Sequence, residues 1–294
     1  MGFDLYQTYP EVREIFDQAD HLLDFSLSEL CFEGPEEELN QDLNAQLAVY
    51  TVSCIVTDVL RVHGVFPDVV SGYSSGFYAA AYAAGCFDFA DGLSLVRRAG
   101  EILLDEGGKI DGGMAVIFGL PPEKVGSVCQ QAGNAQVAIL NTPRQTVISG
   151  IGDSVRRAME LSLSEEALDA YILSVATAYH SRFMEKSSAR FLEEIKDSHL
   201  RNPRIPLISY LSLDYVPDKR ALKNVMAAQL SHPVLWVNLI KRLRSNNIRL
   251  FIEVGPNEMI SRTVKWIDRN IEIVNTANKG KLLKTIERYR RLIQ

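Results

Sequence analysis

A serine flanked by two glycines is the first group in the sequence that could do chemistry. Residues 72–76 read Gly-Tyr-Ser-Ser-Gly, after the run "PDVV" and before the alanine-rich run "FYAAAYAA". The spacing G-x-S-x-G between a strand and a helix is typical of a nucleophile elbow, a sharp turn that exposes a reactive serine. Gly72 and Gly76 are expected to permit a turn too tight for side chains. Ser74 is therefore the candidate nucleophile. The backbone N–H of Ser75, at the start of the following helix, is the candidate donor to an oxyanion.

Such a serine needs a general base, because its hydroxyl is a poor nucleophile at its free pKa. The five histidines are His21, His63, His180, His199 and His232. His180 follows an expected strand and precedes an expected helix, in the kind of loop where sheet-based sites lie. His232, just before a proline, is the second candidate. The other three lie on amphipathic helices or at a charged helix end, and we expect them to be structural or solvated.

The composition indicates a globular protein without a bound metal or nucleotide cofactor. The chain has 294 residues, 47% of them hydrophobic, and a formal net charge of −6, which excludes a general nucleic-acid binder. Its four cysteines are far apart and form no CxxC pair, so no zinc site or disulfide framework is predicted. The first residues do not show the pattern of a signal peptide, and no run of roughly 20 uninterrupted apolar residues is found. We expect a soluble, cytoplasmic protein that binds no membrane.

Helices and short apolar strands alternate along most of the chain, which favours an α/β fold with a mainly parallel sheet covered on both faces. Strands are predicted at 67–72, 204–211 and 250–256. Helical periodicity is found in the segments 11–23, 43–64, 75–85, 88–108, 181–197 and 257–267.

The pattern of predicted secondary structure changes in the middle of the chain. Within about 60 residues the predicted order is strand, helix, strand, strand, helix, strand, which is the ferredoxin-like arrangement. We therefore predict a small subdomain at 113–174, inserted into a core formed by 1–112 and 175–294.

Several segments together carry a family resemblance. In order and spacing they resemble the malonyl-CoA:acyl carrier protein transacylases and related acyltransferase domains of polyketide synthases, and the match covers nearly the whole chain. The resemblance implies an α/β-hydrolase-like core with an inserted ferredoxin-like subdomain, which the strand order indicates independently. The segments are "DLYQTYPEVREIFDQADHLL", "LSELCFEGPEEELN", "GYSSGFYAAAYAAGCFDFADGLSLV", "NTPRQTVISG", "YHSRFM", "QLSHPVLW" and "FIEVGPNEMI".

The resemblance also implies roles for particular residues. Ser74 would hold the acyl group as an ester, and His180 would take its proton and later that of the carrier thiol. The backbone carbonyl of Gln229 would orient the histidine in place of a carboxylate, which leaves His232 as a neighbour. Asn141 would border the active site. An acyl-CoA thioester would be the substrate and an acyl carrier protein the acceptor.

The sequence departs from the family pattern at three substrate-facing positions. Tyr73 and Ser75 stand where the family has His and Leu around the nucleophile. Ala99 stands where an arginine grips the malonyl carboxylate. Arg97 and Arg98 lie about 200° and about 100° away around a helix, and a guanidinium fork cannot be moved by one residue and stay aimed. The resemblance implies a malonyl group as the default, and Ala99 points to an uncharged acyl group as the alternative, unless a local bulge brings Arg98 into the site.

Members of the family that the sequence resembles also carry a glycine-rich, glutamine-bearing loop that supplies a second oxyanion donor, and the sequence begins after the position of this loop. Either the start codon was assigned too late or the loop is absent. The loss of one such donor is expected to raise the barrier by about 2.7–4 kcal/mol.

Three hypotheses follow. The first is a serine acyltransferase that works by ping-pong. The second is a hydrolase that clears acyl groups from a carrier protein. The third is a catalytically weak docking subunit for a carrier protein. The survival of the acyl-serine in water separates the first from the second, and the retention of Ser74, His180 and Gln229 speaks against the third.

Overall fold

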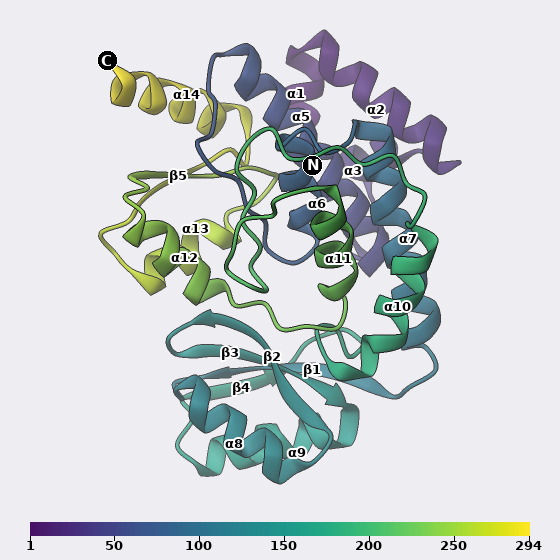
Figure 1. The fold of residues 1–294 in the computed structure, drawn as a ribbon, viewed down its shortest axis with the longest axis vertical. Coiled ribbons are helices and arrows are strands. Elements are labelled where there is room, and N and C mark those ends of the chain that lie inside the picture. The colour runs from purple at the N-terminus through teal and green to yellow at the C-terminus, as the bar shows by residue number, and fades with distance from the viewer.

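The chain forms a large core and a smaller lobe (Figure 1), and the computed structural model describes all 294 residues. Seven helices come before the first strand. Prolines and acidic residues begin several of them; the Asp88 side chain, for example, accepts a hydrogen bond from the Asp91 N–H and caps the seventh helix. The seven are α1 (Phe3–Thr8), α2 (Pro10–Leu23), α3 (Leu27–Glu33), α4 (Glu36–Leu39), α5 (Asp42–Val62), α6 (Gly76–Ala83) and α7 (Phe89–Gly107).

The small lobe follows α7 and contains β1 (Gly112–Phe118), α8 (Pro122–Ala132), β2 (Ala135–Thr142), β3 (Gln145–Ile151), α9 (Gly152–Ser164) and β4 (Asp169–Ile172). Its four strands form an antiparallel sheet in the order β2-β3-β1-β4, with α8 and α9 on one face (Figure 1). This order confirms the predicted ferredoxin-like arrangement. The lobe has its own cluster of 11 buried apolar residues, whereas other side chains of its sheet, such as Val116 and Ile139, belong to the cluster of 58 that fills the large core. The predicted boundaries of this subdomain, 113 and 174, stay a prediction.

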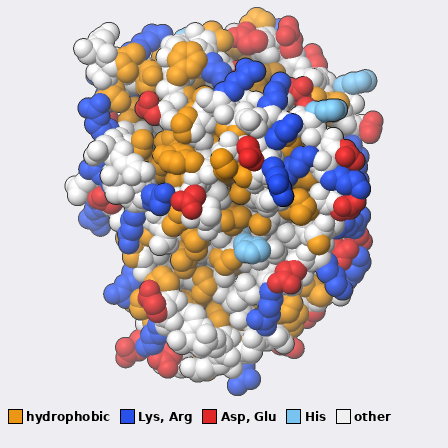
Figure 2. Space-filling view, in the orientation of Figure 1, with side chains coloured by type: hydrophobic (Ala, Val, Ile, Leu, Met, Phe, Trp, Pro, Cys, Tyr) orange, Lys and Arg blue, Asp and Glu red, His pale blue; other side chains and the backbone are white.

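The chain then returns to the large core. Its remaining elements are the 3₁₀ turn η1 (Arg182–Met184), α10 (Glu185–Glu194), α11 (Lys219–Ala228), α12 (Trp236–Ser245), β5 (Leu250–Glu253), α13 (Met259–Ile267), β6 (Glu272–Asn275) and α14 (Lys279–Ile293). The surface reflects this arrangement (Figure 2). Hydrophobic side chains reach the surface near β5, α13 and α14, while charges of both signs gather on the side of α7 and α10.

The parallel sheet of the core is much less extensive than predicted. β5 and β6 form a two-stranded parallel pair. The strands expected at 67–72 and 204–211 meet only at a parallel bridge between Val70 and Leu207. The reason is local: Pro206 has no N–H for a longer ladder, and the other segment turns almost at once into the serine motif.

The two lobes are joined along the edge strand of the small sheet. Ile139 in β2 forms a parallel bridge with Val234, and the Leu140 N–H donates to the Val234 carbonyl. Val234 lies between α11 and α12, so the small sheet is fastened to the segment that contains Gln229 and His232. This attachment fixes the seam at which the candidate site lies.

The helix α5 runs through the large core. By length and composition alone it could cross a membrane, but 61% of its apolar window is buried inside the protein. Residues such as Cys54, Ile55 and Val56 are no more than 1% exposed. α5 is therefore a core helix, held by its packing against α6 and α7.

Candidate active site

The serine motif forms a sharp turn into α6. Ser74 has a φ of 52°, in the left-handed region that a serine adopts at a cost of about 1–3 kcal/mol. A Cβ added to Gly72 would lie 2.2 Å from the carbonyl carbon of Gly76, so only glycine fits at position 72. The same expectation for Gly76 is wrong, because a Cβ there would meet no atom within 4 Å.

Ser74 and His180 come together although 106 residues separate them. The Ser74 Oγ lies 2.8 Å from the His180 Nε2. His180 is buried in the loop between β4 and η1 and also has a left-handed φ, of 56°. Both partners of this contact thus have a backbone conformation that is costly for a residue other than glycine, as is often found at functional sites.

Two backbone carbonyls hold the other side of the imidazole. The His180 Nδ1 lies 2.8 Å from the Gln229 carbonyl and 3.2 Å from the His232 carbonyl. Because carbonyl oxygens only accept, Nδ1 carries the proton and Nε2 is free to accept one from Ser74. No carboxylate takes part. The resemblance points to the Gln229 carbonyl; no sequence signal points to that of His232, since any residue type supplies a backbone carbonyl.

The backbone N–H of Ser75 is free to serve an oxyanion. Ser75 is the N-cap of α6, and its N–H makes no hydrogen bond within the protein, whereas the next N–H groups donate to the carbonyls of Tyr73 and Ser74. A free N–H at a helix N-terminus, next to the nucleophile, is where a tetrahedral oxyanion would be stabilised.

Tyr73 and Asn141 are bonded to each other. The Tyr73 hydroxyl donates to the Asn141 Oδ1 at 2.6 Å, and its ring packs edge-on against Trp236, 5.3 Å between centroids. Asn141 is buried in β2, so the contact ties the serine motif to the small lobe. That the pair also touches substrate stays a prediction.

The chain matches known proteins over most of its length. The family model described as "Acyl transferase domain" matches residues 1–285. The chain belongs to the acyltransferase family.

Its relatives include malonyl CoA-acyl carrier protein transacylase of Bacillus subtilis, 34% identical over 93% of this acyltransferase and 88% of the relative. The polyketide biosynthesis transacylase PksC of the same organism is 34% identical over 92% of this chain and 93% of its own. Among solved structures, the Coxiella burnetii transacylase superposes with a TM-score of 0.94 at 30% identity, over 98% of this chain and 93% of that one. A type II polyketide malonyl-transacylase in complex with its acyl carrier protein gives a TM-score of 0.94 at 25% identity, over 98% and 94%.

The acyltransferase has no free guanidinium at the helix position that the sequence singled out. Ala99 is 1% exposed and packs in the large core. Arg98 pairs with Glu194, with 3.2 Å between Nε and Oε2, and Arg97 pairs with Glu101 at 2.9 Å. Since α7 is continuous from 89 to 107, no bulge brings Arg98 into the site.

Burial sets the electrostatics of the base. It lowers the pKa of His180 to about 4, and the carbonyls of Gln229 and His232 act in the opposite direction. The imidazole is therefore neutral, and able to accept a proton, over the whole neutral pH range.

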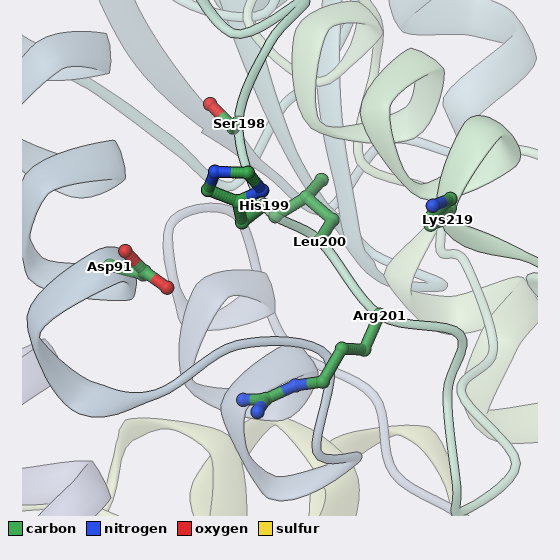
Figure 3. A pocket seen from close by; sticks show the side chains of 6 residues that line it. All are labelled: Asp91, Ser198, His199, Leu200, Arg201 and Lys219. Carbon is green, nitrogen blue, oxygen red and sulfur yellow. The ribbon is translucent and has the colours of Figure 1, made fainter.

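The other chemically suggestive groups lie apart from this site. His199 lines a polar surface pocket of about 340 Å³, together with Asp91, Ser198, Leu200, Arg201 and Lys219. Figure 3 shows the Arg201 side chain extending toward the side of Asp91 and away from Lys219. Neither Ser74 nor His180 lines it. No group of three metal-ligating side chains gathers anywhere in the structure.

The contrast between the two glycines gives a first prediction. Gly72→Ala should destabilise the fold by about 1–3 kcal/mol, because the new Cβ would overlap backbone atoms that cannot move independently. Gly76→Ala, the matched control, should be neutral or stabilising by up to about 1 kcal/mol, since it adds a helix former in open space. Urea denaturation of both variants measures this; equal stabilities would contradict it.

The buried base gives a second prediction. The rate at which p-nitrophenyl acetate acylates Ser74 should stay constant as the pH falls from 7 to about 5, and should fall through a midpoint near 4 as His180 becomes protonated. Circular dichroism at each pH separates this loss from acid unfolding. A midpoint near 6.5, the value of a free histidine, would show that the imidazole is not desolvated.

Proposed function

We propose that this protein transfers an acyl group from coenzyme A to the phosphopantetheine thiol of an acyl carrier protein, through an acyl ester on Ser74. The observation that supports the proposal most directly is the 2.8 Å contact between the Ser74 Oγ and a neutral His180 Nε2, in a chain of the acyltransferase family.

Acylation begins when the Ser74 Oγ attacks the thioester carbonyl carbon while its proton passes to the His180 Nε2. The negative charge of the tetrahedral intermediate develops beside the free N–H of Ser75. The imidazolium is stabilised by the two carbonyls at Nδ1, so no buried carboxylate is needed. When the C–S bond breaks, His180 returns the proton to the coenzyme A sulfur, and the acyl-serine remains.

Transfer to the carrier protein repeats these steps in reverse. The phosphopantetheine thiol gives its proton to the His180 Nε2 and attacks the ester carbonyl. Collapse of the second intermediate breaks the C–O bond, and the proton returns to the Ser74 Oγ. Coenzyme A and the carrier thiol thus use one base in turn, which is the ping-pong order. The named complex of a related transacylase with its acyl carrier protein supports this acceptor.

We infer that the transferase works in the cytoplasm and favours an uncharged acyl group. All four cysteines are buried and free, as in reducing compartments. The relatives are named for malonyl transfer, but the α7 position that the resemblance assigns to the carboxylate clamp holds Ala99, and the neighbouring guanidinium groups are engaged in ion pairs. A malonyl carboxylate would therefore lack the charge-assisted hydrogen bonds that offset its desolvation.

The acyl-enzyme gives the third prediction. Brief mixing with acetyl-CoA, malonyl-CoA or longer acyl-CoAs should produce an acyl mass adduct with the wild type and none with Ser74→Ala, with acetyl-CoA reacting faster than malonyl-CoA. The measurement is intact-protein mass spectrometry, followed by addition of holo-acyl carrier protein, to which the acyl group should move.

The outcomes are distinct. Release of free acid in place of acyl carrier protein thioester would make the protein a hydrolase, and the absence of any adduct on folded protein would reject the acyl-serine. An equal rate with malonyl-CoA would refute only the acyl preference.

The substitution Ala99→Arg gives the fourth prediction. It should raise kcat/KM for malonyl-CoA relative to acetyl-CoA by about 10–100-fold, the value of one charge-assisted hydrogen-bonded pair. Ala99→Met is the control, because it adds a long side chain to the same buried position without charge. A similar ratio in the two variants would mean that position 99 does not face the acyl group.

A further inference from the structure

Tyr210 is a fully buried tyrosine to which the mechanism above gives no part. It lies in the segment that precedes α11 and is 0% exposed. Its hydroxyl donates to the Gln229 Oε1 at 3.0 Å, and Gln229 itself is 2% exposed. The residue whose carbonyl orients His180 is therefore held through its side chain by Tyr210.

This hydrogen bond is the only one that the Gln229 side chain makes. Its Nε2 has no hydrogen-bond partner and neither does the buried hydroxyl of Tyr78. Those two groups are neighbours: burial raises the pKa of Tyr78, and the Gln229 amide opposes that rise. With the Tyr210 hydroxyl removed, both polar atoms of a buried amide would lack partners, and the side chain would have to turn to satisfy them.

The ring of Tyr210 contacts the other half of the site. It lies edge-to-face against Phe77, with 6.1 Å between centroids and planes at 90°. Phe77 is in the first turn of α6, and its backbone N–H donates to the carbonyl of Ser74 at 3.0 Å. One side chain thus touches both the helix that presents the nucleophile and the residue that orients the base.

We propose that Tyr210 is a positioning residue of the acyl-transfer site, which holds Gln229 so that its carbonyl faces the His180 Nδ1. The inference rests on the proposed function, since it assumes that His180 serves Ser74 as a base. The positioning role differs from a purely structural one because Tyr210 exerts it through a single hydroxyl group. The ring, which fills the core and packs on Phe77, is retained when that hydroxyl is removed.

The test compares Tyr210→Phe with Tyr50→Phe. Tyr50 is 2% exposed and its hydroxyl donates to the Phe89 carbonyl at 3.2 Å, so this control removes an equally buried tyrosine hydroxyl away from the site. Tyr210→Phe should lower kcat for acyl transfer about 10-fold with KM unchanged, the loss expected for an unpartnered group that orients an active residue. Tyr50→Phe should leave both constants unchanged.

A second measurement asks whether the effect passes through His180. A fluorophosphonate probe phosphonylates Ser74 with loss of fluoride and depends on the base but not on coenzyme A or a carrier protein. Tyr210→Phe should slow labelling about 10-fold in the wild type and not at all in the His180→Ala background, because residues that act as a unit are not additive.

Each outcome of these measurements either supports the positioning role of Tyr210 or contradicts it. Equal slowing in both backgrounds, or labelling at the wild-type rate, overturns the positioning role while the proposed function stands. If the wild-type protein is folded but is never labelled, both the positioning role and the proposed function are overturned. If Tyr210→Phe does not fold, Gln229→Met replaces it: this variant keeps the backbone carbonyl but removes the amide that Tyr210 holds. It should show the same 10-fold, base-dependent loss, and a wild-type labelling rate would overturn the proposal.

Discussion

The hydrogen bond from the His180 Nδ1 to the backbone carbonyl of Gln229 is the contact on which the site depends. It fixes the tautomer, leaves Nε2 facing Ser74 and supports the charge that develops on the ring during proton transfer. A carbonyl does this without burying a second charge. The ring itself is buried, so its pKa falls to about 4 and the base stays neutral at physiological pH. Burial lowers the pKa, and a neutral carbonyl in the place where other serine enzymes have a carboxylate raises it only in part.

The rest of the fold brings three distant segments to that contact. The turn before α6 presents Ser74, the loop after β4 presents His180, and the end of α11 presents Gln229. Ser74 and His180 each have a left-handed φ, and such strain persists only where the surroundings overdetermine it. The surroundings here are the edge of the small sheet, which bonds to Val234, and the contact of Tyr73 with Asn141 across the seam.

The charged side chains of α7 and α10 pair with one another at the surface of the large core. The ion pairs of α7 and α10 lie on the outer surface, where Arg98 meets Glu194 and Arg190 meets Glu194 and Glu106. The inward position on the same helix is Ala99. The resemblance assigns this position to the carboxylate clamp, and the alanine found there is the basis of the acyl preference proposed above.

The sequence by itself determined the elements that depend on local pattern. Neighbouring residues encode the glycine spacing around Ser74, the alternation of strands and helices, and the βαββαβ order. The order of the motifs along the chain identified His180 and Gln229. It overestimated the parallel sheet and the need for glycine at position 76, because strand pairing and free space depend on what lies opposite. Only the tertiary structure decided that Nδ1 meets two carbonyls, that Arg98 is engaged with Glu194 and that Tyr210 holds Gln229. These contacts join residues that are 19 to 96 positions apart, through backbone carbonyls, a buried hydroxyl or an ion pair, and no local residue pattern encodes which groups meet.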